Sequence, residues 1–492
     1  MKTRGQDSTV SDTGQKPAIQ VICLGASGGP SEESVTAFLV RSVHSGWARG
    51  SLLALDAGSH LAPITRILER DFPTVSDGKR IDGPEPTVLT SGPFSGLELP
   101  HASARANALH VLRAYISAYL ITHPHLDHIS GFAINTAAFH ATSKPKTLAA
   151  LPMTVDAIKQ HIFNDVIWPN LTDEDGGVGF VTFQRLKEGG DVMVGDGEGR
   201  GYIDVVDGLG IRAFKISHGV STKVAPTHHH RGSISGFPDI PVINETTQFM
   251  ARTSQPSPRL SATAMDIPCV VDSTAFFIRD DHTALEVLMF GDLEPDSISL
   301  YPRNRIVWEE AARKIALGLL RGIFIECSYE DAQGDAILFG HLCPRHLISE
   351  LQSLAALVAE ARATRAMEKS LRKRKRSVAN GPDSAKHTVS VHNRKRSRSL
   401  AGRSVAKDIR RSSAPGHAAS HVTTSPPLGQ TLPAAAGLKV VVMHIKDTMK
   451  DGPYVGETIL AQLQQHEAQL DESGTALGCE FVVAKSGESY WL

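Results

Sequence analysis

The stretch Thr122-His123-Pro124-His125-Leu126-Asp127-His128 decides the interpretation of this chain, because it places four potential metal ligands within seven residues. In an extended segment residues i and i+2 point to the same side, so His123 and His125 can share one ion. Asp127 and His128 lie where the chain turns into its next element and can reach a neighbouring ion. Imidazole and carboxylate together suit zinc in sites that keep a position open for water. The stretch therefore predicts a catalytic metal site.

Three more residues are candidate ligands, because each follows an apolar run that reads as a strand. They are His218, Asp292 and His444. Taken singly, each is as readily an ordinary turn residue. Together with the cluster at 122–128 they supply about as many ligands as a pair of metal ions needs. We therefore expect these side chains to meet in one two-metal site.

Strand-like and helix-like segments alternate along the chain, which places it in the α/β class. Three early strand-like segments joined by short loops (19–25, 36–40 and 51–58) indicate an antiparallel start to a sheet. Helical spacing of apolar residues predicts a helix over 101–120 and another over 346–366. We expect a disordered N-terminus over 1–17 and a catalytic domain over 18–366, with an inserted loop at 221–264. A basic disordered insertion over 367–433 then interrupts this domain, and 434–492 form its remainder.

Composition limits the class of protein further. The 492 residues are 41% hydrophobic, and no apolar run approaches the roughly 18 residues of a membrane-spanning helix. The polar N-terminus lacks the apolar stretch of a signal peptide, so we expect an intracellular, cytoplasmic protein that does not act on a membrane. Five scattered cysteines without a Cys-x-x-Cys pair argue against a disulfide framework.

Charge is distributed unevenly along the chain. Residues 361–411 contain 17 Lys and Arg against 3 Asp and Glu, although the net charge of the whole chain is −1. A Ser-rich, basic segment of this kind cannot bury enough apolar surface to fold, so we expect it to be disordered. Runs such as 372–376 are typical of regulatory tails or nuclear-import signals, and Arg410-Arg411-Ser412-Ser413 resembles a site for a basophilic protein kinase. No aromatic residues interleave with these runs, so nucleic-acid binding by stacking is not expected.

The order and spacing of the ligand motifs resemble the metallo-β-lactamase superfamily. More narrowly, the tract 122–131 is similar to the signature of the class II 3′,5′-cyclic-nucleotide phosphodiesterases, the low-affinity type found in fungi. Ile167-Trp168-Pro169-Asn170-Leu171 and Leu338-Phe339-Gly340-His341-Leu342 also fit that family. The resemblance runs from about Val21 to Leu492, outside the loop at 221–264 and the basic segment.

This resemblance implies an αββα sandwich with two metal ions at one edge between the sheets. It implies that one ion is held by His123, His125 and His218. The second ion is held by Asp127, His128 and His444, and the carboxylate of Asp292 bridges the two. The expected ions are two divalent cations, Zn²⁺ before others. A bridging hydroxide would then open a cyclic nucleotide, cAMP before cGMP, to the 5′-nucleotide and so lower cAMP signalling. The resemblance also implies that Asp127 is a catalytic residue.

Further candidates concern the leaving group and the substrate. His341 is the candidate proton donor to the departing 3′-oxygen, because the carboxylate of Glu326 could hold it protonated; a capping role in a turn is the alternative. Lys446, two residues after His444, is either a phosphate contact or a solvated lysine. Ser273 is a further candidate substrate contact.

Two other functions fit the same ligands. A metal-dependent RNA-processing endonuclease of the same superfamily would use the basic segment to hold RNA, and its binding would depend steeply on salt. A non-catalytic binding module would keep the fold without the reaction. Intact candidate ligands at every expected position argue against the module.

Overall fold

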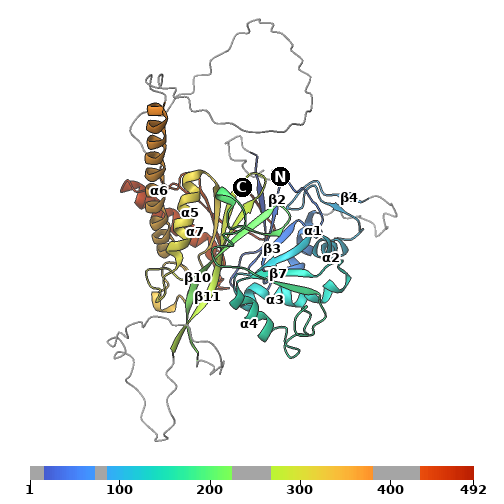
Figure 1. Ribbon diagram of the computed structural model, residues 1–492. Helices are drawn as coiled ribbons and strands as arrows, with labels where there is room; N and C mark the ends of the chain where they lie inside the picture. Colours follow the sequence, from blue (N-terminus) through green and yellow to red (C-terminus); the bar gives the residue numbers. More distant parts are fainter. Residues whose placement is uncertain (1–15, 72–85, 224–266, 380–432) are drawn as a thin grey trace, which may run out of the picture.

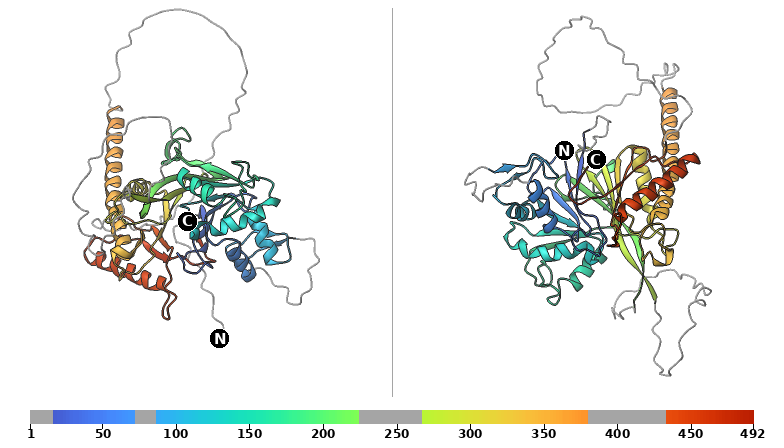
Figure 2. Two further views of the ribbon diagram at one scale, coloured as in Figure 1. Left: turned by 90° about the horizontal axis from the view of Figure 1, so that it is seen from below. Right: turned by 180° about the vertical axis from the view of Figure 1, so that it is seen from behind.

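The computed structural model describes residues 16–71, 86–223, 267–379 and 433–492. Two seven-stranded sheets pack face to face, and helices cover the outer face of each, as Figures 1 and 2 show. Helices α1 to α4 lie outside one sheet and α5 to α7 outside the other. The layers are therefore αββα, and the expectation of an α/β sandwich is confirmed.

The first sheet has the strand order β16-β1-β2-β3-β6-β7-β8. Strands β16, β1, β2 and β3 pair antiparallel, and β3, β6, β7 and β8 pair parallel, so the predicted antiparallel start is confirmed. Its strands are β1 Ile19–Gly25, β2 Ala37–Ser42, β3 Leu52–Ala57, β6 Ile116–Leu120, β7 Lys146–Ala150, β8 Val181–Arg185 and β16 Ser489–Trp491. A separate two-stranded sheet pairs β4 Thr87–Val88 with β5 Glu98–Leu99.

The second sheet has the order β15-β14-β13-β12-β11-β10-β9, parallel from β12 to β15 and antiparallel from β9 to β12. Its strands are β9 Ile203–Val206, β10 Leu209–Lys223, β11 Ile267–Asp280, β12 Glu286–Phe290, β13 Leu320–Glu326, β14 Lys439–Met443 and β15 Glu480–Val483.

The helices connect strands and lie on the outer faces of the two sheets. The α-helices are α1 Leu61–Asp71, α2 Ala104–Ala114, α3 Leu126–Asn135, α4 Pro152–His161, α5 Asn304–Leu317, α6 Pro344–Ala379 and α7 Val455–Glu472. Short 3-10 turns are η1 Thr136–Ala141, η2 Gly197–Gly199 and η3 Asp335–Ile337. None of the described helices has the length and apolar character needed to cross a membrane.

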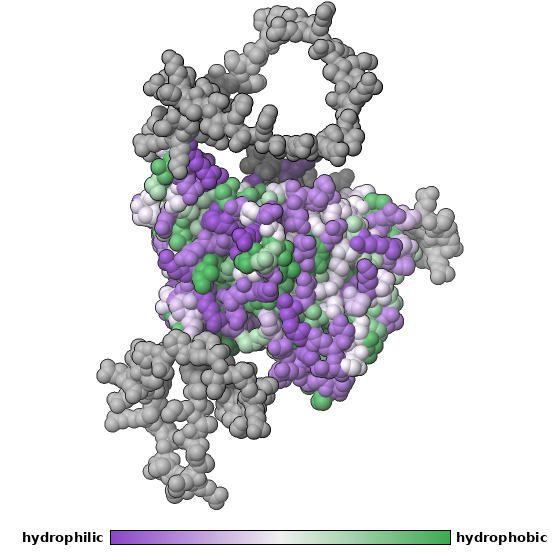
Figure 3. All heavy atoms as spheres, in the orientation of Figure 1, coloured by the Kyte–Doolittle hydropathy of each residue, from purple (hydrophilic) through white to green (hydrophobic). Residues whose placement is uncertain are grey.

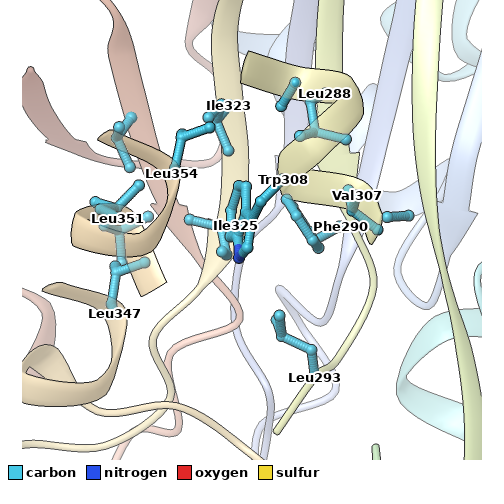
Figure 4. Packing of buried hydrophobic residues seen from close by; sticks show 14 of the residues in the cluster. Leu288, Phe290, Leu293, Val307, Trp308, Ile323, Ile325, Leu347, Leu351 and Leu354 are labelled. Carbon is cyan, nitrogen blue, oxygen red and sulfur yellow. The ribbon is translucent and has the colours of Figure 1, made fainter. Parts of the chain in front are cut away.

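Three apolar layers hold the sandwich together, and alternation along the strands produces them. In β1, Ile22 and Leu24 face the helices while Val21 and Cys23 face the other sheet. Behind the second sheet, Trp308 of α5 packs among residues of β12, β13 and α6 (Figure 4). On the face drawn in Figure 3, hydrophilic residues predominate and hydrophobic ones lie among them, as is usual for a folded surface.

Two segments differ from the sequence prediction. The helix expected over 101–120 is wrong beyond residue 114, because residues 116–120 form the buried strand β6; a short apolar run fits either structure by periodicity alone. Helix α6 continues to Ala379, into the segment expected to be disordered from Met367 (Figure 1). Residues 345–379 contain no Gly or Pro and many Arg, Lys, Leu and Glu, which favour helix.

The remaining predictions about disorder lie mostly outside the described residues. This applies to 1–15, to 380–432 with its proposed kinase site at Ser412 and Ser413, and to 224–266 of the inserted loop. Residues 221–223, assigned to that loop, instead extend β10.

Candidate metal centre

The candidate ligands come from both sheets and lie at one edge of the sandwich. His123 follows β6, Asp292 follows β12 and His444 follows β14, each within three residues of the strand's last residue. The carboxyl ends of parallel strands meet at the same sheet edge, which explains why these residues gather there. His218 lies in β10 at a bulge in its pairing with β11, and the bulge turns its side chain toward that edge.

Glycines let the two halves of the site approach closely. A Cβ atom on Gly58 would lie 1.9 Å from the carbonyl oxygen of Asp127, so only glycine lets α3 begin against the end of β3. A Cβ on Gly28 would lie 2.7 Å from Nε2 of His444. The predicted ligands therefore depend on backbone that comes within contact distance of them.

The carboxylate of Asp292 lies in the middle of the cluster. Its oxygens are 3.1 Å from Nε2 of His444, 3.3 Å from Nε2 of His128, and 3.7 Å from Nε2 of both His123 and His218. Two ligand groups share it, each within 4.8 Å: His123, His125, His218 and Asp292; and Asp127, His128, Asp292 and His444. This is the grouping that the family resemblance implied.

The far ring nitrogens of the histidines are held by the surrounding protein. Nδ1 of His128 lies 2.7 Å from the Asp56 carboxylate, and Nδ1 of His444 lies 2.7 Å from the Thr36 hydroxyl. Nδ1 of His218 donates to the carbonyl oxygen of Gly340 at 2.8 Å. Contacts of this kind fix the ring orientation and the tautomer that leaves Nε2 free to bind a metal.

The inward-facing nitrogens fit a metal site. Nε2 of His123, His128 and His444 is buried and has no hydrogen-bond partner among the described residues. Leaving buried polar atoms unpaired is costly, so a native structure provides a partner for them. Ligand atoms around a tetrahedral zinc at about 2.0–2.1 Å lie roughly 3.3 Å apart, close to the 3.1 to 3.7 Å seen around Asp292. The residues present therefore fit divalent metal ions.

Electrostatics point the same way. Burial lowers the pKa of His123 and His444 well below the usual histidine value. Burial would raise the pKa of Asp292, but the imidazoles of His444, His128 and His123 outweigh it and hold that pKa well below its usual range. Burial likewise opposes charge on His128, yet the carboxylates of Asp292 and Asp56 raise its pKa well above normal. The carboxylates thus favour positive charge at this place. His123 and His444 have the neutral imidazoles that bind metal, and metal binding at His128 would release its proton.

His341 lies beside this centre and pairs with Glu326 as the sequence predicted. Its Nδ1 is 3.0 Å and 3.1 Å from the two oxygens of the buried Glu326 carboxylate. Its ring centroid is 4.7 Å from that of His218. Burial lowers the pKa of His341, but the charge and the hydrogen bond of Glu326 outweigh that effect, so the net shift is upward.

The two predicted substrate contacts differ in position. Lys446 donates from Nζ to the carbonyl oxygen of Gly28 at 3.1 Å, next to His444. Ser273 is only 1% exposed, and its hydroxyl lies where a Cβ on Gly291 would come within 2.5 Å. Ser273 therefore packs beneath the turn that presents Asp292, and its burial argues against direct contact with substrate.

Sequence reasoning missed two residues that position the ligands. Asp56 is fully buried and accepts hydrogen bonds from the backbone and hydroxyl of Thr122 as well as contacting His128. Its one signal is that it closes an apolar strand in the same way as Asp292 does. Thr36, which contacts His444, gives no signal in the sequence, because a threonine at the start of a predicted strand is ordinary.

The αββα sandwich, with histidines and a shared carboxylate at one edge between its sheets, defines the class of this protein as a metallo-β-lactamase-type fold with a candidate metal centre. The family model for class-II cAMP phosphodiesterases matches residues 85–399, more than half of the chain. The chain belongs to that family, and the prediction of a class II cyclic-nucleotide phosphodiesterase is confirmed.

Similar proteins agree with this assignment. A 3′,5′-cyclic-nucleotide phosphodiesterase of Schizosaccharomyces pombe is 29% identical over 335 residues, covering 68% of this chain and 75% of the relative. 3′,5′-cyclic-nucleotide phosphodiesterase 1 of Saccharomyces cerevisiae is 27% identical over 364 residues, covering 69% of this chain and 83% of the relative. The crystal structure of unliganded yeast PDE1 superposes with a TM-score of 0.60 at 21% identity, covering 97% of this chain and 100% of that one.

Proposed function

We propose that this cyclic-nucleotide phosphodiesterase hydrolyses 3′,5′-cyclic AMP to 5′-AMP with two divalent ions, Zn²⁺ being the expected metal, and so lowers cAMP signalling. The observation that carries the proposal is the set of buried Nε2 atoms of His123, His128 and His444 around Asp292, which find no hydrogen-bond partner in the described part of the chain. The family match and the cyclic-nucleotide phosphodiesterase activity of the yeast relatives support the substrate class.

The two ligand groups would each hold one ion. His123, His125 and His218 would hold the first, and Asp292 would be shared between the two. The second would be held by Asp127, His128 and His444. The chemistry that such a pair supplies is neutralisation of the phosphate oxygens and a lowered pKa of the attacking water.

The protein's own groups would handle the leaving group. Attack of water on phosphorus breaks the bond to the 3′-oxygen, which needs a proton to leave as a hydroxyl. His341 would donate that proton, because Glu326 holds its Nδ1 and raises its pKa, leaving Nε2 as the donor. The Nζ of Lys446, close to His444, would add positive charge near the phosphate.

The test is hydrolysis by the purified protein with cAMP, cGMP and a 3′-extended RNA as substrates, each with and without chelator, with bound metal measured on the same sample. We expect chelator-sensitive hydrolysis of cAMP, about two ions per chain, and no RNA cleavage. Cleavage of RNA with cyclic nucleotides left intact would favour the nuclease. Less than about one ion per chain with no hydrolysis would favour a binding module.

A matched pair of variants tests the proton donor. His341→Asn should keep metal and lose most of kcat, because general-acid catalysis contributes about 10²–10⁴-fold. The control is His140→Asn, an exposed histidine on η1, which should retain full activity. A His341→Asn protein with unchanged kcat would remove His341 from the reaction.

A further inference from the structure

Phe339 has two properties that are unusual for a phenylalanine. Its side chain is exposed, with 71% of the residue accessible, and its backbone has φ of 53°, in the left-handed region. Residues with a Cβ atom are disfavoured there, and bulky ones more than most. Strained residues of this kind cluster at functional sites and are kept where a side chain is needed in that place.

The turn that carries Phe339 is fixed against the candidate metal centre. The carbonyl oxygen of the next residue, Gly340, accepts the hydrogen bond from Nδ1 of His218 at 2.8 Å. Gly340 also packs on Gly219, where a Cβ on Gly340 would come within 2.9 Å of backbone atoms. His341 follows directly, so the Cα atoms of Phe339 and His341 are at most about 7 Å apart.

One of the proposed ligands close to this turn is itself exposed. Among the proposed ligands His125 is exposed, whereas His123, His218 and Asp292 are buried. The ring centroid of His125 is 5.1 Å from that of His218, and His218 contacts the turn of Phe339. An exposed ligand and the turn that carries the exposed Phe339 therefore both adjoin His218.

We propose that the phenyl ring of Phe339 stacks on the nucleobase of the cyclic nucleotide; this rests on the proposed function. With the phosphate at the ligands, the base must lie beside them toward solvent, and it presents a flat aromatic face. Base–aromatic stacking corresponds to roughly 5- to 150-fold in binding and tolerates any base, since every base has such a face. Phe339 is thus a substrate-binding residue for the base and does not distinguish adenine from guanine.

The test uses Phe339→Gly, because glycine suits the positive φ and the turn should keep its shape. We expect the KM for both cAMP and cGMP to rise about 5- to 150-fold with little change in kcat. Phe339→Trp should keep a KM close to that of the wild type, whereas Phe339→Leu should raise KM as Phe339→Gly does. The control is Ile337→Ala, which removes another exposed apolar side chain (50% accessible) from the preceding η3 turn and should leave KM unchanged.

A ribose 3′,5′-cyclic phosphate without a base separates stacking from damage to the site. Its hydrolysis should be the same in wild type and Phe339→Gly. An unchanged KM for cAMP in Phe339→Gly, or an equal loss with the base-free substrate, would overturn the proposal. If the wild type hydrolyses neither cyclic nucleotide, the proposed function fails instead. Equal dissociation constants of wild type and Phe339→Gly for 5′-AMP would then still refute contact with the base.

Discussion

Replacing Asp56 by asparagine should disable the metal centre through His128, although Asp56 is not one of the proposed ligands. Oδ1 of Asp56 accepts from the backbone N–H of Thr122 at 2.9 Å. Oδ2 accepts from the Thr122 hydroxyl at 2.8 Å and lies 2.7 Å from Nδ1 of His128. The backbone N–H of Thr122 and the N–H of His128 need acceptors at different oxygens of Asp56, and an amide has only one oxygen.

Either orientation of the new amide is therefore unfavourable. If the NH₂ group faces His128, Nδ1 of that ring must accept, so the proton moves to Nε2 and the nitrogen aimed at Asp292 can no longer bind metal. If the NH₂ group replaces Oδ1 and faces the backbone N–H of Thr122, two buried donors meet. The backbone N–H is then left unpaired, which costs about 1–3 kcal/mol. Loss of such a ligand-orienting carboxylate typically costs 10–100-fold in metal affinity, about 1.4–2.7 kcal/mol.

The assay is competition for metal with a chromogenic chelator, together with urea unfolding in the presence of excess chelator. Asp280→Asn is the matched control, because Asp280 is also fully buried and accepts from the Ser42 hydroxyl at 2.5 Å and from the backbone and hydroxyl of Thr283. Both variants should unfold at lower urea, and only Asp56→Asn should lose metal affinity. Wild-type metal affinity in Asp56→Asn would refute the reasoning.

Three further changes have defined outcomes. Glu326→Gln removes the charge that raises the pKa of His341, and a donor must be protonated, so the alkaline fall in kcat should move to lower pH; an unmoved pH profile would contradict the donor role. Burial lowers the pKa of His60 to about 3. Below about pH 6.5 the unfolded chain therefore binds a proton at this residue that the folded chain does not bind, so the stability of the fold decreases as the pH decreases. In His60→Phe, the loss of unfolding free energy between about pH 6.5 and 5 should be smaller by on the order of 1–2 kcal/mol, measured by urea unfolding at each pH; equal losses would argue against a neutral His60. Trp308→Ala should destabilise the protein by about 3–5 kcal/mol in urea unfolding, because it empties a fully buried site and removes the 2.6 Å hydrogen bond to Glu350; a loss below about 1 kcal/mol would contradict that packing.

The sequence predicted the candidate ligands because their positions follow a simple rule. A polar residue directly after an apolar run marks a strand end, and parallel strands bring such ends to one sheet edge. His123, Asp292 and His444 obey this rule, so their meeting could be anticipated before the sheets were known. His341 and Glu326 could be paired on the same argument, and they lie in hydrogen-bond contact.

What the sequence could not show depends on which strands are neighbours and how side chains turn. Asp56 reaches His128 because β3 pairs with β6, a pairing with no local signature. Ser273 lies in a strand as expected, but its burial under Gly291 depends on how the Asp292 turn folds over it. The helix prediction for residues 116–120 is wrong because a run of five mostly apolar residues fits the helical period and the strand period equally well.

Strand β14 gives the chain an unusual dependence on its last segment. It lies inside the second sheet between β13 and β15, it leads directly to His444, and β16 beyond it pairs with β1 in the first sheet. The piece 433–492 therefore completes both sheets and the ligand set. Supplied as a separate polypeptide, it should restore a protein ending at Ala379 by fragment complementation. Because covalent linkage raises the effective concentration of the two pieces, such a split enzyme would become active only as their concentrations rise.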